Sequence, residues 1–178
     1  NISGCRQITD LTPLKGIYAL DIGWCRGITD ITPLKGIHTL NIFQCTGIES
    51  LEPLKGIREL CMQGCEQITD LYSIASSLHT LDINNCHNIT DLSPISNCPI
   101  RYLDMSRCIQ ITDISPLKGM TTLVDLIISD CCYLTDITPL KNANINLTMY
   151  YCDQIIDIET LSSIRTVIGR KIINTDNC

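Results

Sequence analysis

The stretch LDIGWCRGITDITP, residues 20–33, returns in altered copies along the whole chain and decides the fold. A cysteine marks each copy, and subtraction of successive cysteine positions gives steps of 20 to 23 residues. The eight marker cysteines are Cys5, Cys25, Cys45, Cys65, Cys86, Cys108, Cys131 and Cys152. A short period that runs through the chain predicts a solenoid, in which each coil packs against its neighbours, rather than a globular core.

The apolar residues of each copy follow the frame LxxLxLxxCxxI. One copy fills this frame with Ile17, Leu20, Ile22, Cys25 and Ile28. The frame resembles the leucine-rich repeat in its cysteine-containing form, and the resemblance covers the whole chain. It implies a parallel sheet on the concave side of the solenoid, with a column of inward cysteines that hydrogen-bond the backbone of the coils.

Each coil is expected to contain one strand and one short helical turn. Residues 40–44 alternate apolar and variable side chains, which is the pattern of a half-buried strand. Residues 12–16, TPLKG, place threonine before proline and glycine three residues after it, so they predict a 3₁₀ turn that threonine caps and glycine closes. The predicted fold class is α/β, mostly β with short 3₁₀ turns: a single solenoid of residues 1–178, with about eight coils of 20–23 residues.

The segment between cysteine and helical turn carries a second resemblance. Its ITDxTPL pattern, as in residues 28–34, is similar to the convex side of internalins, whereas the CxxI part is more like the repeats of F-box substrate receptors. Protist regulatory proteins with leucine-rich repeats combine both features, and the chain resembles that group most. The aspartates of this pattern are predicted to accept backbone N–H groups in their own turns rather than to bind Ca²⁺.

The chain opens inside a repeat, at Asn1, so we expect a fragment or part of a longer array. The first copy is as apolar as an interior one, because it contains Ile2, Cys5, Ile8 and Leu11. An exposed edge of this kind needs a cover. We therefore expect either upstream residues over this edge or end-to-end self-association of the solenoid.

The twelve cysteines bear on the cellular location. Eight of them share one inward column, which favours buried, reduced thiols and a cytoplasmic protein over a disulfide-linked secreted one. We expect these eight thiols to be protected, and Cys61 and Cys178 to react readily. The glycosylation-type triplets at Asn1 and Asn88, with a third at Asn146, are the argument for a secreted or surface location.

Charge and composition exclude several classes of function. A net charge of −6 and a pI of about 4.9 argue against a nucleic-acid partner. No apolar run is long enough to span a membrane. Asp82 and Asp104 hold the same outward position in successive copies and could form an acid–base pair, but Arg101 and Arg107 are expected to neutralise them. We therefore predict no enzyme, no catalytic residues, no metal site and no cofactor.

Outward strand positions differ from copy to copy, whereas inward positions are nearly constant. Aromatic residues and arginine, which dominate interface hot spots, gather at the outward positions. The predicted partner-binding residues are Tyr18, Trp24, Phe43, Arg58, Arg101, Tyr102, Arg107, Tyr150 and Tyr151. We expect Trp24 and Phe43 to form one anchor with Tyr18 and Arg58 beside them, and Arg101, Tyr102 and Arg107 to form a second cluster.

The predicted function is therefore that of a protein–protein interaction module, which binds a protein partner through the concave sheet face. Two alternatives stay open. The first is a structural protein whose coils stack end to end through uncapped solenoid ends. The second is a substrate-receptor or regulatory adaptor subunit whose recruiting domain lies elsewhere.

Overall fold

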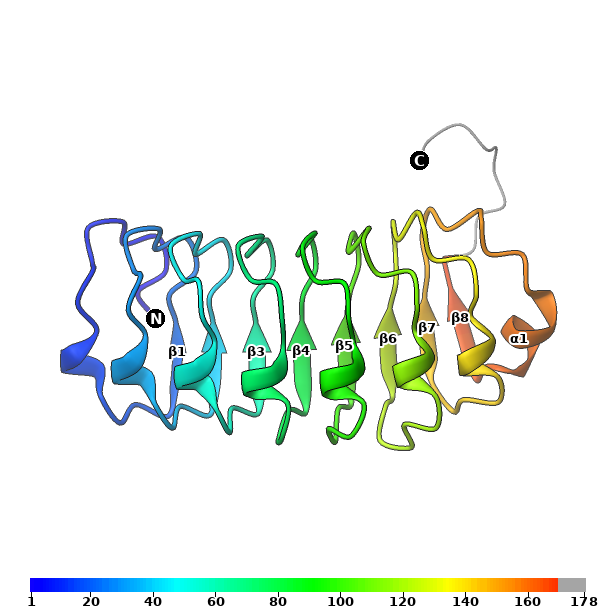
Figure 1. Cartoon of the computed structure of the whole chain (residues 1–178), viewed down its shortest axis with the longest axis horizontal. Coiled ribbons are helices and arrows are strands. Elements are labelled where there is room, and N and C mark those ends of the chain that lie inside the picture. Colours follow the sequence, from blue (N-terminus) through cyan, green and yellow to red (C-terminus); the bar gives the residue numbers. More distant parts are fainter. Residues whose placement is uncertain (170–178) are drawn as a thin grey trace.

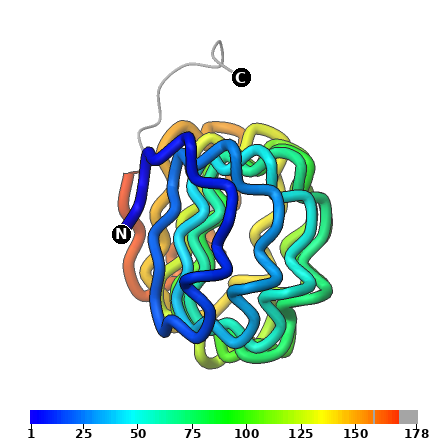
Figure 2. Tube along the Cα trace, turned by 90° about the vertical axis from the view of Figure 1, so that its left-hand side faces the viewer, coloured from blue at the N-terminus to red at the C-terminus, as the bar shows by residue number. Residues whose placement is uncertain are grey.

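The computed structural model describes residues 1–169 as a solenoid with one strand in each coil (Figure 1). Eight strands form a single sheet in chain order, and every neighbouring pair is parallel. The strands stack along one side of the coils and the 3₁₀ turns lie along the other (Figure 1), and Figure 2 shows the stacked coils end on. The predicted leucine-rich-repeat solenoid is confirmed.

The elements are short and regular. The strands are β1 (Ala19–Asp21), β2 (Thr39–Asn41), β3 (Glu59–Cys61), β4 (Thr80–Asp82), β5 (Tyr102–Asp104), β6 (Asp125–Ile127), β7 (Asn146–Thr148) and β8 (Thr166–Ile168). The 3₁₀ turns are η1 (Thr12–Leu14), η2 (Thr32–Leu34), η3 (Glu52–Leu54), η4 (Tyr72–Ile74), η5 (Ser93–Ile95), η6 (Ser115–Leu117) and η7 (Thr138–Leu140). One α-helix, α1 (Ile158–Ser163), replaces the 3₁₀ turn in the last described coil.

The register places each repeat position opposite its own copy. Leu20 pairs with Leu40, and Leu60 pairs with Leu81, so the strand leucines form one buried column. The strand expected at residues 40–44 is confined to β2. It ends early because Asn41 Oδ1 accepts a hydrogen bond from Phe43 N at 2.9 Å and closes a tight turn. The backbone then becomes left-handed at Gln44, with a φ of 56°, a conformation outside the strand region.

The cysteine ladder joins successive coils through their backbone carbonyls. Ile22 O accepts a hydrogen bond from Cys25 N at 3.0 Å within its coil, and from Cys45 Sγ of the next coil at 3.0 Å. All the ladder thiols from Cys25 to Cys152 repeat this bond to the preceding coil, at 3.0 to 3.2 Å. The predicted inward role is confirmed, because each thiol satisfies the second lone pair of a buried carbonyl.

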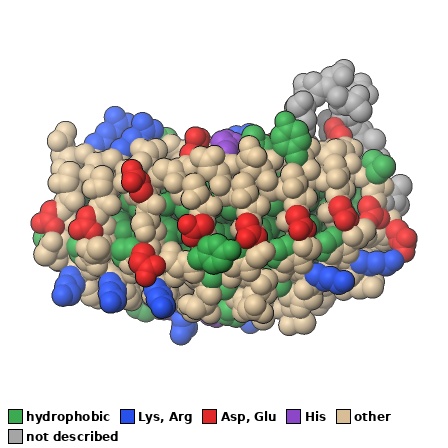
Figure 3. Space-filling view, in the orientation of Figure 1, with side chains coloured by type: hydrophobic (Ala, Val, Ile, Leu, Met, Phe, Trp, Pro, Cys, Tyr) green, Lys and Arg blue, Asp and Glu red, His purple; other side chains and the backbone are tan. Residues whose placement is uncertain are grey.

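The aspartate column fixes the start of each 3₁₀ turn. Asp10 Oδ1 accepts from Thr12 N, and Asp30 Oδ1 accepts from Thr32 N, each at 2.8 Å. The predicted role of the aspartates is confirmed, whereas the prediction that threonine caps the turn is wrong. Leu11 holds the cap position of η1 and makes no side-chain cap bond. Figure 3 shows the resulting row of acidic side chains on this face.

The two ends of the described solenoid differ. In the first coil Ile2, Ile8 and Ile17 are only partly buried, whereas Ile22 and Ile28 of the second coil are inaccessible. The apolar edge expected at the first coil is therefore present, and what covers it stays a prediction. At the other end Asp157 caps α1 by accepting from Thr160 N at 2.9 Å. No helix within residues 1–169 is long and apolar enough to cross a membrane.

Candidate functional site

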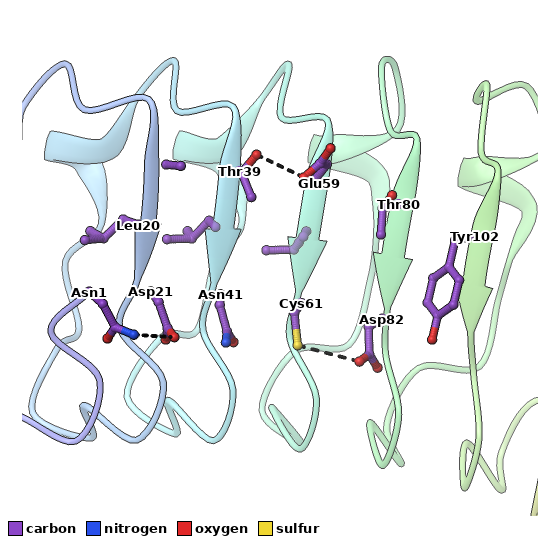
Figure 4. Close-up of a pocket in the computed structure, with 13 residues that line it drawn as sticks. Asn1, Leu20, Asp21, Thr39, Asn41, Glu59, Cys61, Thr80, Asp82 and Tyr102 are labelled. Atoms are coloured by element: carbon purple, nitrogen blue, oxygen red, sulfur yellow. Dashed lines mark hydrogen bonds between the residues drawn. The ribbon is translucent and has the colours of Figure 1, made fainter.

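The outward face of the sheet contains a groove of about 460 Å³ that crosses β1 to β5 (Figure 4). We call it the sheet groove. It is lined by Asn1, Ala19, Leu20, Asp21, Thr39, Leu40, Asn41, Glu59, Leu60, Cys61, Thr80, Asp82 and Tyr102. Apart from Asn1 and the strand leucines, these residues hold the outward positions beside the leucine, two from each of β1 to β4 and one from β5, so the groove follows from the repeat.

The strand-end position of the groove is held rigidly by the backbone that follows it. Asp82 Oδ1 accepts from Asn84 N, and Asp104 Oδ1 accepts from Ser106 N, each at 2.9 Å. Asn41 makes the same bond with its amide oxygen, to Phe43 N at 2.9 Å. Because either a carboxylate or an amide serves this turn, the fold does not require negative charge at these positions.

The charges of the sheet groove are all acidic. Asp21, Glu59 and Asp82 line it, and no lysine or arginine does. Burial, together with the neighbouring Asp104 carboxylate, raises the pKa of Asp82. Asp82 Oδ2 accepts only a weak bond from Cys61 Sγ, at 3.6 Å. The groove floor therefore carries negative charge that no cation of the lining balances.

Arg101 and Arg107 do not neutralise Asp82 and Asp104, contrary to expectation. Arg107 Nε pairs instead with Asp130 Oδ2 of the next coil, at 3.2 Å. Arg101 precedes β5 and lies at the other end of the strand from Asp104. Within residues 1–169 the only other ion pair joins Lys141 to Glu159, on the far side of the coil. The carboxylates of Asp82 and Asp104 thus keep their repulsion.

Changing Asp82 to asparagine is expected to stabilise the fold at neutral pH. Asparagine preserves the bond to Asn84 N, as Asn41 shows in its own coil, and it removes the partly buried charge. Because the pKa of Asp82 is raised in the folded state, its ionisation disfavours folding above that pKa, and the penalty disappears as the pH falls below the ordinary pKa of an aspartate.

Urea unfolding at pH 7 and at pH 3 measures this effect. The variant should have the higher free energy of unfolding at pH 7, and the difference from the parent chain should shrink at pH 3. Equal free energies at pH 7, or a gap that grows on acidification, would contradict the assignment. Glu49→Gln, at an exposed residue, is the charge-matched control.

Trp24 and Phe43 lie side by side, as predicted. Trp24 and Phe43 lie in adjacent coils with their ring centroids 5.0 Å apart in an edge-to-face arrangement, and Arg26 lies over the Trp24 ring at 5.2 Å. The Trp24 side chain is 39% exposed. These two rings, here called the aromatic rim, follow β1 and β2 at the edge of the sheet face.

Trp24 occupies a backbone position that does not suit a bulky residue. Its φ is 64°, and the equivalent residues of the other coils are also left-handed. They are Gly4, Gln44, Gly64, Asn85, Arg107, Asp130 and Tyr151. Glycine and asparagine tolerate this conformation, whereas other side chains are disfavoured by about 1 kcal/mol or more. Tryptophan therefore occupies this position without benefit to the local backbone.

The other predicted binding residues are split between two edges of the sheet face. Tyr18 precedes β1 and stacks on His38, with ring centroids 4.5 Å apart, whereas Trp24 follows β1. The prediction that Tyr18 and Arg58 lie beside the aromatic rim is therefore wrong, because they lie at the opposite end of the strands.

The second predicted cluster is divided in the same way. Arg101 lies at the same edge of the sheet face as Tyr18, and Arg107 lies at the opposite edge, where the aromatic rim lies. Tyr102 lies between them, on β5 in the groove. Tyr150 and Tyr151 are exposed beyond β7, and the Tyr150 ring packs over Gly169. Sequence reasoning did not include Asp21, Glu59 or Thr39 in the site. Their outward position in the frame was the signal that could have identified them.

Two cysteines differ from their predicted accessibility. Cys5 is exposed, because no coil precedes it in these 178 residues, although it belongs to the ladder column. Cys61 is half-buried in the groove, and burial raises the pKa of its thiol to about 11. Cys178 lies outside the described residues. No group of three or more His, Cys, Asp or Glu side chains within residues 1–169 is placed to hold a metal ion.

Comparison with known proteins identifies the fold. No family model and no curated protein sequence matches the chain. Among solved structures, the internalin inlF of Listeria monocytogenes superposes with a TM-score of 0.55 at 22% identity, over 95% of this chain and 60% of inlF. Internalin C2 of the same species superposes with a TM-score of 0.50 at 24% identity, over 92% and 67% of the two chains. The chain is thus similar in fold to internalins, and it spans about three fifths of the length of inlF.

Proposed function

We propose that this solenoid is a protein-interaction module, not an enzyme, and that it binds its partner through the sheet face. The aromatic rim carries the proposal. The chain contains one tryptophan and one phenylalanine, and the fold places both at one edge of the open sheet face. Trp24 is partly exposed, and its left-handed backbone disfavours a bulky side chain by about 1 kcal/mol or more. Contact with a partner would compensate for that cost.

The sheet face also has the other properties of a binding surface. It is free of covering elements in the described solenoid, it contains the sheet groove, and its outward side chains differ from coil to coil. The inward residues, by contrast, repeat because they must fill the same core. The fold similarity to internalins concerns architecture, and we extend it to protein binding only as part of this proposal.

The test compares two variants that the chain itself shows to be compatible with the fold. In the first variant both Trp24 and Phe43 are replaced with asparagine. The coil of β4 has asparagine at both of these repeat positions: Asn85, which is left-handed like Trp24, and Asn84, which is equivalent to Phe43. The control, Tyr72→Thr, removes an aromatic from η4 that is even more exposed than Trp24, at a position where other coils have threonine. Truncation of a hot-spot aromatic costs about 2 kcal/mol, so partner affinity should fall by about 30-fold in the double variant.

Affinity capture from a lysate of the source cells, quantified by mass spectrometry, measures partner recovery. At least one protein should be recovered by the parent chain and by Tyr72→Thr, and lost by the double variant. If every partner is recovered equally by the double variant, or if Tyr72→Thr alone abolishes recovery, the sheet face is not the interface.

A further inference from the structure

The sheet groove also defines the chemistry of what it binds. Asp82 lines the groove, and Asp104, just outside the lining, is its direct register partner, so the two carboxylates lie on neighbouring strands, β4 and β5, about 4.8 Å apart. The turn N–H groups use one oxygen of each. The described residues donate no hydrogen bond to Oδ2 of Asp104. Two adjacent carboxylates with spare acceptor capacity are complementary to an ammonium or guanidinium group.

Tyr102 completes the lining at this point. It lies on β5 opposite Thr80 of β4 and Asp125 of β6, one row away from Asp82 and Asp104, and is half-buried. Burial and the nearby carboxylates raise the pKa of its hydroxyl to about 12, so it stays protonated at neutral pH. The ring offers an aromatic surface to a cation, and the carboxylates beside it make an anionic ligand unfavourable.

We infer that the sheet groove binds an extended, basic peptide segment of a protein partner, with a lysine or arginine over Asp82 and Asp104 and an apolar side chain at the aromatic rim. This inference rests on the proposed function. The five strands that the groove crosses span about 19 Å, which is the length of about six extended residues. A flat sheet face offers room for such a segment across the strands, and its charge is complementary to a basic one.

The spacing of the two anchors follows from the strand order. The aromatic rim belongs to the coils of β1 and β2, and the carboxylate pair belongs to β4 and β5. Their midpoints are three strands apart, about 14 Å, and an extended segment covers that distance in about four residues. The bound segment should therefore carry its apolar residue and its basic residue about four positions apart.

A random twelve-residue peptide library displayed on phage, selected on the immobilised 178-residue chain, tests this chemistry directly. Selected peptides should be enriched in lysine or arginine about four positions from an apolar residue. The synthetic peptides are then measured by fluorescence anisotropy against an acid-floor variant, Asp82→Asn with Asp104→Asn. Its control is Glu49→Gln with Glu66→Gln, which changes the net charge equally at exposed residues outside the groove lining.

The acid-floor variant should bind at least about 10-fold more weakly, because it loses charge-assisted hydrogen bonds to the basic residue, and the control should bind like the parent. The selected peptides could instead bind more weakly to the chain with Trp24→Asn and Phe43→Asn and yet show no enrichment in lysine or arginine. That result would overturn this inference and leave the proposed function standing. If the control variant weakened peptide binding equally, the inference would also be overturned, because the attraction would then depend on the net charge of the chain and not on the groove. Failure to select any peptide that depends on the rim or the floor would count against both.

Discussion

Replacing Leu81 with alanine in the middle of the solenoid is expected to lower the free energy of unfolding by about 2–5 kcal/mol. Leu81 is inaccessible to solvent and pairs with Leu60 on one side and Leu103 on the other. A cavity at this point weakens the packing between one coil and both of its neighbours. Because a solenoid is stabilised by contacts between adjacent coils, the loss affects both halves of the array.

Urea unfolding followed by circular dichroism measures this loss, with Leu20→Ala as the matched comparison. Leu20 lies on β1, at the first strand of the sheet, and retains 6% exposure. Its replacement should cost less than that of Leu81, because β1 pairs with only one other strand. A cost below about 1 kcal/mol at Leu81, or equal costs at both leucines, would contradict stabilisation through neighbouring coils.

The ladder thiols are expected to react with iodoacetamide at least about 1,000-fold more slowly in the native chain than in denaturant. They are buried, and burial raises the pKa of Cys65, Cys86 and Cys131 to about 12, so little thiolate forms at pH 8. Reaction then requires local unfolding, and an opening free energy of about 4 kcal/mol gives this factor. Cys5, which is exposed, is the internal control and should react without delay.

Peptide mapping by mass spectrometry after timed alkylation separates the sites. The protected set is Cys25, Cys45, Cys65, Cys86, Cys108, Cys131 and Cys152. Cys61 should react more slowly than Cys5, because it is half-buried and its thiol pKa is about 11. Labelling of the ladder at the rate of Cys5 would show that the coils open freely, and disulfides between ladder positions would remove the reason for expecting a cytoplasmic protein.

Most of the fold could be predicted from the repeat frame. The inward residues recur at fixed spacing because every coil must fill the same core, so the period, the parallel sheet and the cysteine column follow from the sequence. The aspartate column was equally accessible to sequence reasoning. Asp10 bonds the backbone only two residues further on, at Thr12, and a contact this local depends little on the rest of the chain.

The tertiary structure alone decided how the outward residues combine. Tyr18 and Trp24 are close in sequence, yet the strand between them places them at opposite edges of the sheet face. Arg107 pairs with Asp130, 23 residues away, because coil stacking brings successive copies together and the left-handed backbone at both residues directs their side chains. Coil stacking also produces three other features: the continuous groove, the uncompensated pair of Asp82 and Asp104, and the burial of Cys61. Each of these features depends on contacts between coils. The repeat in the sequence predicts which coils are neighbours, but it does not predict in which direction the outward side chains point.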